Sequence, residues 1–184
     1  MAAVLLAGCG DVVVQHGDHP DAPLPGAIDL STATPFPTLA AAPPAAAVAA
    51  LQVSAAGGAA QPLGSLLGTR ATVLAFWQTS CPPCAAELPA LQRMEPGLAR
   101  QGVRLLLVDL QEGAGTARAW AAAHSVDLPL YGDGDGSVHD ALGLLGVPTT
   151  AVLGSGGGLV DRLEGAADVA GLVTALHDMG ISTQ

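Results

Sequence analysis

Apolar runs and helix-like segments alternate through the middle of the chain. The runs "TVLAFW" at 72–77 and "GVRLLLVDL" at 102–110 are short and rich in strand formers, as is typical of strands buried on both faces. Helices are predicted after them, at 82–101 and 115–124. Because two strands joined through a helix form a right-handed crossover, the order strand, helix, strand, helix predicts a parallel central sheet.

The C-terminal third continues with a predicted hairpin. Two apolar segments, 149–153 and 159–163, flank the glycine-rich stretch 154–158, which favours antiparallel pairing. The other predicted elements are a short strand at 50–54, helical turns at 63–67 and 137–145, and a last helix at 169–179. Together they predict an α/β fold in which helices flank a central mixed β-sheet with an added N-terminal strand region.

The first 47 residues differ from the rest. Residues 10–47 are rich in Pro, Ala, Asp and Thr and lack a sustained hydrophobic period, which predicts a flexible spacer before a folded domain at 48–184. Residues 1–9 are apolar and end in "LAGC", which resembles the lipobox of bacterial lipoproteins with Cys9 as the lipid-carrying residue. Because no Lys or Arg precedes Cys9, two alternatives stay open: a signal that starts upstream of Met1, or an ordinary thiol.

Composition narrows the range of partners. A chain of 184 residues with 50% hydrophobic content has material for one ordinary domain with appendages. Six basic against sixteen acidic residues give a net charge of −10. Nucleic acids and anionic lipids would be repelled, so neither is expected as a charge-driven partner.

The stretch "SCPPC" places Cys81 directly after a predicted buried strand and at the start of a predicted helix. Unpaired N–H groups and the helix dipole favour a thiolate at this position. Cys84 follows one turn later, where it can resolve a mixed disulfide formed by Cys81. A Cys-x-x-Cys pair before a helix in a βαβ pattern indicates a redox motif.

Two other interpretations of the pair are weaker. A structural zinc site needs two further ligands, but the only other cysteine is Cys9, and no histidine pair follows at zinc-finger spacing; no metal is therefore expected. A purely structural disulfide across two residues closes so small a loop that it removes little unfolded-state entropy. The pair is predicted to be a reversible dithiol.

Three stretches together, "VLAFWQTSCPPCAAELP", "LGVPTTAVL" and "GLVDRLEG", resemble the membrane-tethered thioredoxin-like proteins of the TlpA/ResA type. The resemblance covers about residues 48–180 and implies a thioredoxin-like fold. It also implies that Pro148 follows a cis peptide bond in a loop that faces the cysteines. The residues that it places in contact with substrate are Trp77, Pro82, Pro83, Val147 and Thr149.

Glu87 lies three residues after Cys84, on nearly the same helical face. In ResA-like proteins a glutamate at this motif position manages protons during exchange, whereas thioredoxin uses a strand aspartate whose position here is Ala75. The alternative is a solvated first-turn carboxylate that complements the helix dipole. The sequence departs from the pattern at Ser80, where the family usually has tryptophan, and at Ala85 and Ala86, where a basic residue is common, which leaves substrate preference open.

The prediction for function is an extracytoplasmic thiol:disulfide oxidoreductase that works as a reductase. Pro82 and Pro83 lack N–H groups, so a thiolate at Cys81 has fewer donors, which disfavours the reduced form and makes the protein more reducing. The resemblance implies an apocytochrome c or a copper-site protein as substrate, a membrane thiol-transfer protein as electron donor, and a lipid anchor at Cys9. No cofactor is expected beyond the disulfide that Cys81 forms with Cys84.

Two alternatives come from other classes of protein. Peroxiredoxins share the fold but need a threonine three residues before the reactive cysteine; here that residue is Gln78, with Thr79 out of register. A copper chaperone would pair the cysteines with a distant histidine, His124 or His139. The default interpretation of both histidines is a solvated surface side chain.

Overall fold

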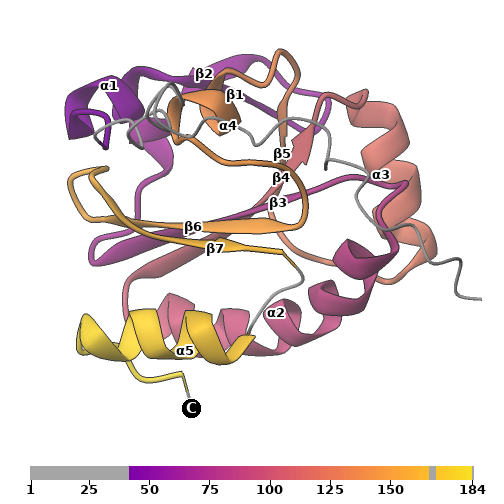
Figure 1. Ribbon diagram of the computed structural model, residues 1–184. Coiled ribbons are helices and arrows are strands. Elements are labelled where there is room, and N and C mark those ends of the chain that lie inside the picture. Colours follow the sequence, from indigo (N-terminus) through magenta and orange to yellow (C-terminus); the bar gives the residue numbers. More distant parts are fainter. Residues whose placement is uncertain (1–41, 166–168, 184) are drawn as a thin grey trace, which may run out of the picture. The chain divides into compact units, whose positions relative to one another are not determined.

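The computed structural model describes residues 42–165 and 169–183. The strands are β1 (Gln52–Ala55), β2 (Ala60–Pro62), β3 (Ala71–Trp77), β4 (Val103–Leu110), β5 (Leu130–Asp133), β6 (Thr149–Gly154) and β7 (Leu159–Glu164). The helices are α1 (Ala45–Ala50), the 3-10 helix η2 (Leu63–Leu66), α2 (Pro82–Arg100), α3 (Ala114–Ala123), α4 (Ser137–Ala141) and α5 (Val169–Asp178). Figure 1 shows how these elements are arranged.

The seven strands of the described residues form one sheet in the order β2-β1-β5-β4-β3-β6-β7. β3 pairs in parallel with β4, and β4 with β5. β6 joins β3 antiparallel and β7 joins β6 antiparallel, across the predicted glycine-rich turn. The predicted mixed sheet and hairpin are therefore confirmed, and β3 lies in the interior with a strand on either side.

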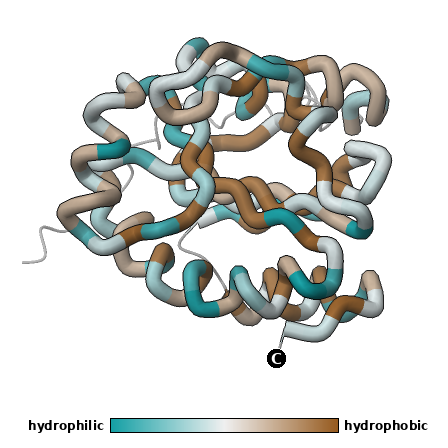
Figure 2. Tube along the Cα trace, turned by 180° about the vertical axis from the view of Figure 1, so that it is seen from behind, coloured by the Kyte–Doolittle hydropathy of each residue, from teal (hydrophilic) through white to brown (hydrophobic). Residues whose placement is uncertain are grey.

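Two helical layers cover the sheet. α2 and α5 lie on one face, and α1 and α4 on the other (Figure 1). Side chains of β3 alternate between two buried clusters, because successive strand residues point to opposite faces. Val73, Ala75 and Trp77 belong to the α2 side, and Leu74 and Phe76 to the α1 side. Figure 2 shows the apolar residues concentrated along the strands between the layers.

The folded region starts earlier than predicted. The proposed boundary at residue 48 falls inside α1, so residues 45–47, which were assigned to the spacer, are helical. This run is mostly alanine, the best helix former, and the helix buries Val48 completely. Cys9 and the remainder of the predicted spacer up to residue 41 lie outside the described residues.

The other predicted elements occur within a few residues of their expected bounds, but two strands went unpredicted. β2 has three residues and β5 has four, and both lack the long apolar run that marks β3 and β4. Pairing with β1 and with β4 holds them in the sheet, so tertiary context decides their structure. Among the described residues, no helix combines the length and apolar character needed to cross a membrane.

Candidate redox site

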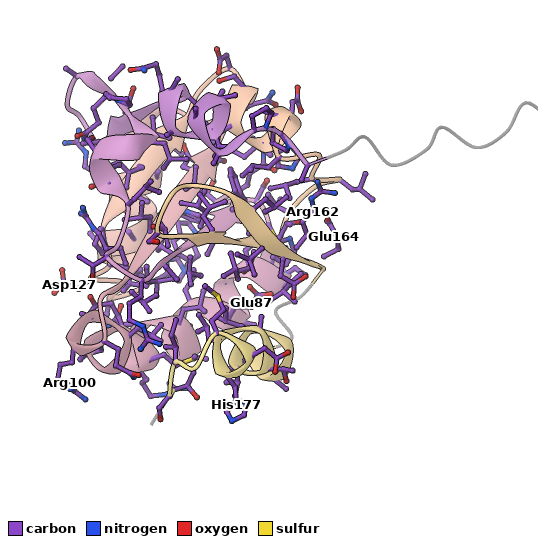
Figure 3. The ribbon with its side chains drawn as sticks, turned by 90° about the vertical axis from the view of Figure 1, so that its left-hand side faces the viewer. Glu87, Arg100, Asp127, Arg162, Glu164 and His177 are labelled. Carbon is purple, nitrogen blue, oxygen red and sulfur yellow. A yellow bond between two sulfur atoms is a disulfide. The ribbon has the colours of Figure 1, made fainter. Side chains whose placement is uncertain are left out.

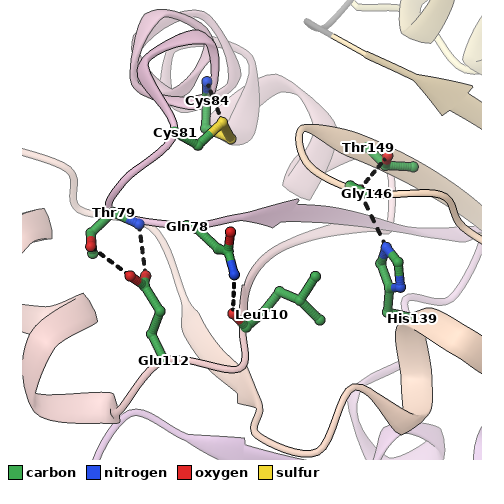
Figure 4. The surroundings of a disulfide bond; sticks show 9 residues. All are labelled: Gln78, Thr79, Cys81, Cys84, Leu110, Glu112, His139, Gly146 and Thr149. Atoms are coloured by element: carbon green, nitrogen blue, oxygen red, sulfur yellow. Dashed lines mark hydrogen bonds between the residues drawn. A yellow bond between two sulfur atoms is a disulfide. The ribbon is translucent and has the colours of Figure 1, made fainter.

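A disulfide joins Cys81 and Cys84 where β3 leads into α2 (Figure 4). Cys81 is the N-cap residue, Pro82 and Pro83 occupy the first two helical positions, and Cys84 is buried. The backbone N–H of Cys84 donates a hydrogen bond to the Sγ atom of Cys81, 3.2 Å away. The first turn of α2 therefore still supplies one backbone N–H donor to the Cys81 sulfur, although its two prolines lack the N–H groups that other residues would offer.

The Val147–Pro148 peptide bond is cis, as the resemblance implied. Pro148 is buried, and Val147 packs against both hydrophobic clusters. The segment from Gly146 to Thr149 lies in the surroundings of the disulfide (Figure 4). Two segments about sixty residues apart in sequence thus come together where β3 ends and β6 begins.

The five predicted substrate contacts differ in their exposure. Pro82 and Pro83 are exposed and Val147 is half-buried, so all three can reach a partner. Trp77, in contrast, is 1% exposed, and the side chain of Thr149 is buried as well. Each of these two side chains points into the interior from a strand covered by helices, and their contact with substrate stays a prediction.

Trp77 instead belongs to a cluster of three rings, in which it packs at a tilt of 50° against Trp120. Its ring lies 4.9 Å from that of Trp120, which stacks at 3.8 Å on the exposed ring of His124. The indole Nε1 of Trp77 is buried and has no hydrogen-bond partner among the described residues. Its role in this structure is packing beneath the disulfide segment.

Glu87 is 8% exposed, so the interpretation as a solvated first-turn carboxylate is wrong. It lies on α2 one turn beyond Cys84 and is labelled in Figure 3. Burial raises the pKa of Glu87 to about 7, because the interior disfavours the charged form. The group can therefore gain or lose a proton near neutral pH.

A second buried carboxyl, Asp109, was not predicted. It is 1% exposed near the end of β4, in register with Trp77 on the neighbouring β3. Burial raises its pKa to about 7, and the nearby Glu112 adds to the effect. The signal was visible in "LLLVDL", where one acidic residue interrupts an apolar strand.

Glu112 holds the segment just before the disulfide. Its carboxylate accepts hydrogen bonds from the backbone N–H of Thr79 at 2.7 Å and from the Thr79 hydroxyl at 2.6 Å. Although burial acts to raise the pKa of Glu112, the Thr79 bonds hold it below its usual value. The side-chain amide of Gln78 donates a hydrogen bond to the carbonyl oxygen of Leu110 at 2.9 Å. The hydrogen bonds of Gln78 with Leu110 and of Thr79 with Glu112 thus hold residues 78–79 against the end of β4 and the residues that follow it (Figure 4).

Asp109→Asn should change how stability depends on pH. A carboxyl whose pKa is raised on folding, here from 3.8 to about 7, favours the folded state only while it is protonated. Its contribution is complete below pH 4 and lost as the pH rises to 7, on the order of 2–4 kcal/mol. We expect urea unfolding of the oxidised Asp109→Asn variant to show a smaller decline in unfolding free energy between pH 4.5 and 7.5.

The matched control for this experiment is Asp178→Asn, because that side chain is exposed. The control should keep the wild-type pH dependence. If the unfolding free energy declined equally with pH in Asp109→Asn and in wild type, the prediction would be contradicted.

The histidines proposed for copper lie in different surroundings. His139 is buried rather than solvated, which corrects the default interpretation, whereas His124 is exposed as expected. In the part of the chain that the structure describes, no three His, Cys, Asp or Glu side chains are grouped so that they could hold a metal ion. Gln78 stands where peroxiredoxins need a threonine, and its side-chain amide donates a hydrogen bond to the carbonyl oxygen of Leu110.

Comparisons with known proteins identify relatives of the chain. Residues 44–162 match the model of the AhpC/TSA family. The thiol-disulfide oxidoreductase ResA of Halalkalibacterium halodurans is 31% identical over 87 residues, 47% of this chain and 49% of the relative. ResA proteins of several other bacteria match at similar levels. The chain spans about half the length of these curated relatives.

Solved structures support the fold. A secreted Mycobacterium tuberculosis disulfide oxidoreductase homologous to Escherichia coli DsbE superposes with a TM-score of 0.59 at 18% identity, covering 72% of this chain and 98% of that one. Peroxiredoxin Q of Xanthomonas campestris gives a TM-score of 0.62 at 22% identity, covering 78% and 97%. At such identities the likeness concerns the fold alone, and it confirms the predicted thioredoxin-like architecture.

Proposed function

Because the chain belongs to the AhpC/TSA family, we propose that it is a thiol:disulfide oxidoreductase that reduces disulfides in a partner protein. The observation that carries the proposal is the Cys81–Cys84 disulfide at the start of α2, with Cys81 half-buried and Cys84 buried. The similarity to proteins named ResA supports the same chemistry.

The reaction transfers two electrons from the reduced pair to the partner. The Cys81 thiolate attacks one sulfur of the partner disulfide, and the other partner sulfur leaves as a thiolate and takes up a proton. Cys84 then loses its proton and attacks the Cys81 sulfur, which releases the second partner thiol and forms the Cys81–Cys84 disulfide. The burial of Cys84 keeps it from competing for the first attack.

In this scheme Glu87 accepts the Cys84 proton during resolution. The two residues are one helical turn apart, where side chains are neighbours. A general base works best when its pKa is near the working pH, because it is then ionised in a large fraction of molecules and still binds a proton well. The pKa of Glu87, about 7, meets this condition.

Glu87→Gln should slow resolution by about 10²-fold at neutral pH, the lower range for one general base. In the wild type, resolution should accelerate as the pH rises through about 7, because only ionised Glu87 accepts a proton. Stopped-flow measurement of mixed-disulfide decay between pH 5 and 9 checks both statements. An unchanged pH profile in Glu87→Gln would refute the role, and Glu95→Gln, on the same helix, serves as the control.

The setting of the reaction is part of the proposal. We place the protein outside the cytoplasm, anchored through a lipid on Cys9 and reduced by a membrane thiol-transfer protein. Its substrate would be an apocytochrome c or a copper-site protein. The support is the lipobox-like "LAGC" and the similarity to ResA proteins.

The test combines trapping with a potential measurement. Cys84→Ser should accumulate a mixed disulfide through Cys81 with a peptide carrying an oxidised Cys-x-x-Cys-His motif, detectable by mass spectrometry. In defined thiol buffers the wild type should have a reduction potential near or below about −270 mV, the value of thioredoxin. A potential near about −120 mV would instead indicate an oxidant, and the absence of a reversible disulfide would overturn the proposal.

A further inference from the structure

His139 is a buried polar side chain beside the site that the proposed reaction does not use. It is 7% exposed and lies on the short helix α4, which precedes the cis-proline segment. Its Nε2 atom is 3.3 Å from the carbonyl oxygen of Gly146 (Figure 4). A carbonyl oxygen can only accept, so Nε2 donates in this hydrogen bond.

The Gly146 carbonyl oxygen receives a second contact. The hydroxyl of Thr149 lies 2.7 Å from it and 2.9 Å from the Oε2 atom of Glu164 on β7. One backbone oxygen, two residues before Pro148, is thus held by side chains from α4 and from β6. These contacts fix the ends of the cis-proline segment.

The His139 ring is itself firmly placed. Its edge packs against Phe76, with ring centroids 5.6 Å apart, and Phe76 belongs to the strand that carries the disulfide segment. The backbone N–H groups of Val138 and His139 donate to the buried carboxylate of Asp133 at 3.2 and 2.9 Å. The Nδ1 atom is 3.4 Å from the exposed carboxylate of Asp140.

We propose that His139 is a positioning residue that sets the geometry of the cis-proline segment, residues 146–149, through the Gly146 carbonyl. The inference rests on the proposed function, because these residues lie beside the disulfide where a partner protein must dock. Leu145, directly before the segment, is 87% exposed, while Leu144 is buried in the interior. A segment held at both ends binds an extended partner without first being ordered.

His139→Leu tests the proposal, because leucine suits a buried site but cannot donate. The reduced variant should react about fivefold to tenfold more slowly than wild type with the oxidised Cys-x-x-Cys-His peptide, from the loss of one hydrogen bond. Its reaction with dipyridyl disulfide, which needs Cys81 alone, should stay within about twofold of wild type. Saturation kinetics should show a raised KM and little change in kcat.

Two further variants separate positioning from general damage. His139→Gln retains a long side-chain donor and should restore most of the peptide rate. Thr149→Val removes the other donor to Gly146 and should reproduce the selective loss. His177→Leu on α5 is the matched control at an exposed histidine and should match wild type.

The outcomes are distinct. The positioning role is overturned if wild type reduces the peptide and His139→Leu reduces it at the same rate. It is also overturned if His139→Leu reacts more slowly by the same factor with the peptide and with dipyridyl disulfide. If wild type reacts with dipyridyl disulfide but not with the peptide, the proposed function itself fails.

Discussion

Cys81→Ser is expected to stop electron transfer to any disulfide-bonded partner. A serine hydroxyl does not ionise near neutral pH and cannot form a disulfide, so both the attack and the resolution steps are lost. The other thiol of the pair, Cys84, is buried and cannot replace it. We expect reduction of the oxidised Cys-x-x-Cys-His peptide to fall to the background rate, which quenched-flow mass spectrometry measures.

Cys84→Ser is the matched variant, because it makes the same replacement of sulfur by oxygen one helical turn away. It should retain the first attack at Cys81 and stop at the mixed disulfide. If Cys84→Ser instead lost the first attack and Cys81→Ser kept it, the assignment of nucleophile and resolving residue would be reversed.

Trp77→Ala is expected to have the largest effect on stability, lowering the free energy of unfolding by about 3–5 kcal/mol. Trp77 is 1% exposed and packs against the ring of Trp120, so its removal opens a cavity beneath the disulfide segment. Small domains are stable by roughly 5–15 kcal/mol, so a large part of the total would be lost. Guanidinium unfolding of the oxidised protein measures the change.

The same experiment separates packing from substrate binding at Trp77. Trp120→Ala, at the half-buried partner ring, should destabilise the protein less. A substrate-contact role for Trp77 would raise the KM for the peptide while leaving the unfolding free energy unchanged. That result would contradict the burial seen in the structure.

The active pair was predictable because its signals are local. A buried strand followed by Cys81, two prolines and a helix is a contiguous pattern, and the first turn of a helix tolerates proline. The cis bond before Pro148 was predictable only through the family resemblance. Proximity in sequence to Pro148 did not reveal that the side chain of Thr149 points into the interior, because successive strand side chains alternate between the two faces of the sheet.

The supporting residues required the folded structure. The sequence left open whether Glu87 is solvated or buried. The packing of one side of α2 against the rest of the domain buries it, and this burial raises its pKa to about 7. Asp109 becomes part of the site because β4 pairs in register with β3. His139 reaches Gly146 because α4 turns back against the end of β3.

By itself the sequence determined the alternation of strands and helices, the mixed sheet, and a redox pair at the start of α2, since each depends on short-range periodicity or on neighbouring residues. The tertiary structure alone decided that β5 is a strand, that α1 extends the folded region to Ala45, and which side chains lie buried beside the disulfide. Burial and pairing between distant segments set these features, and they depend on the whole chain at once.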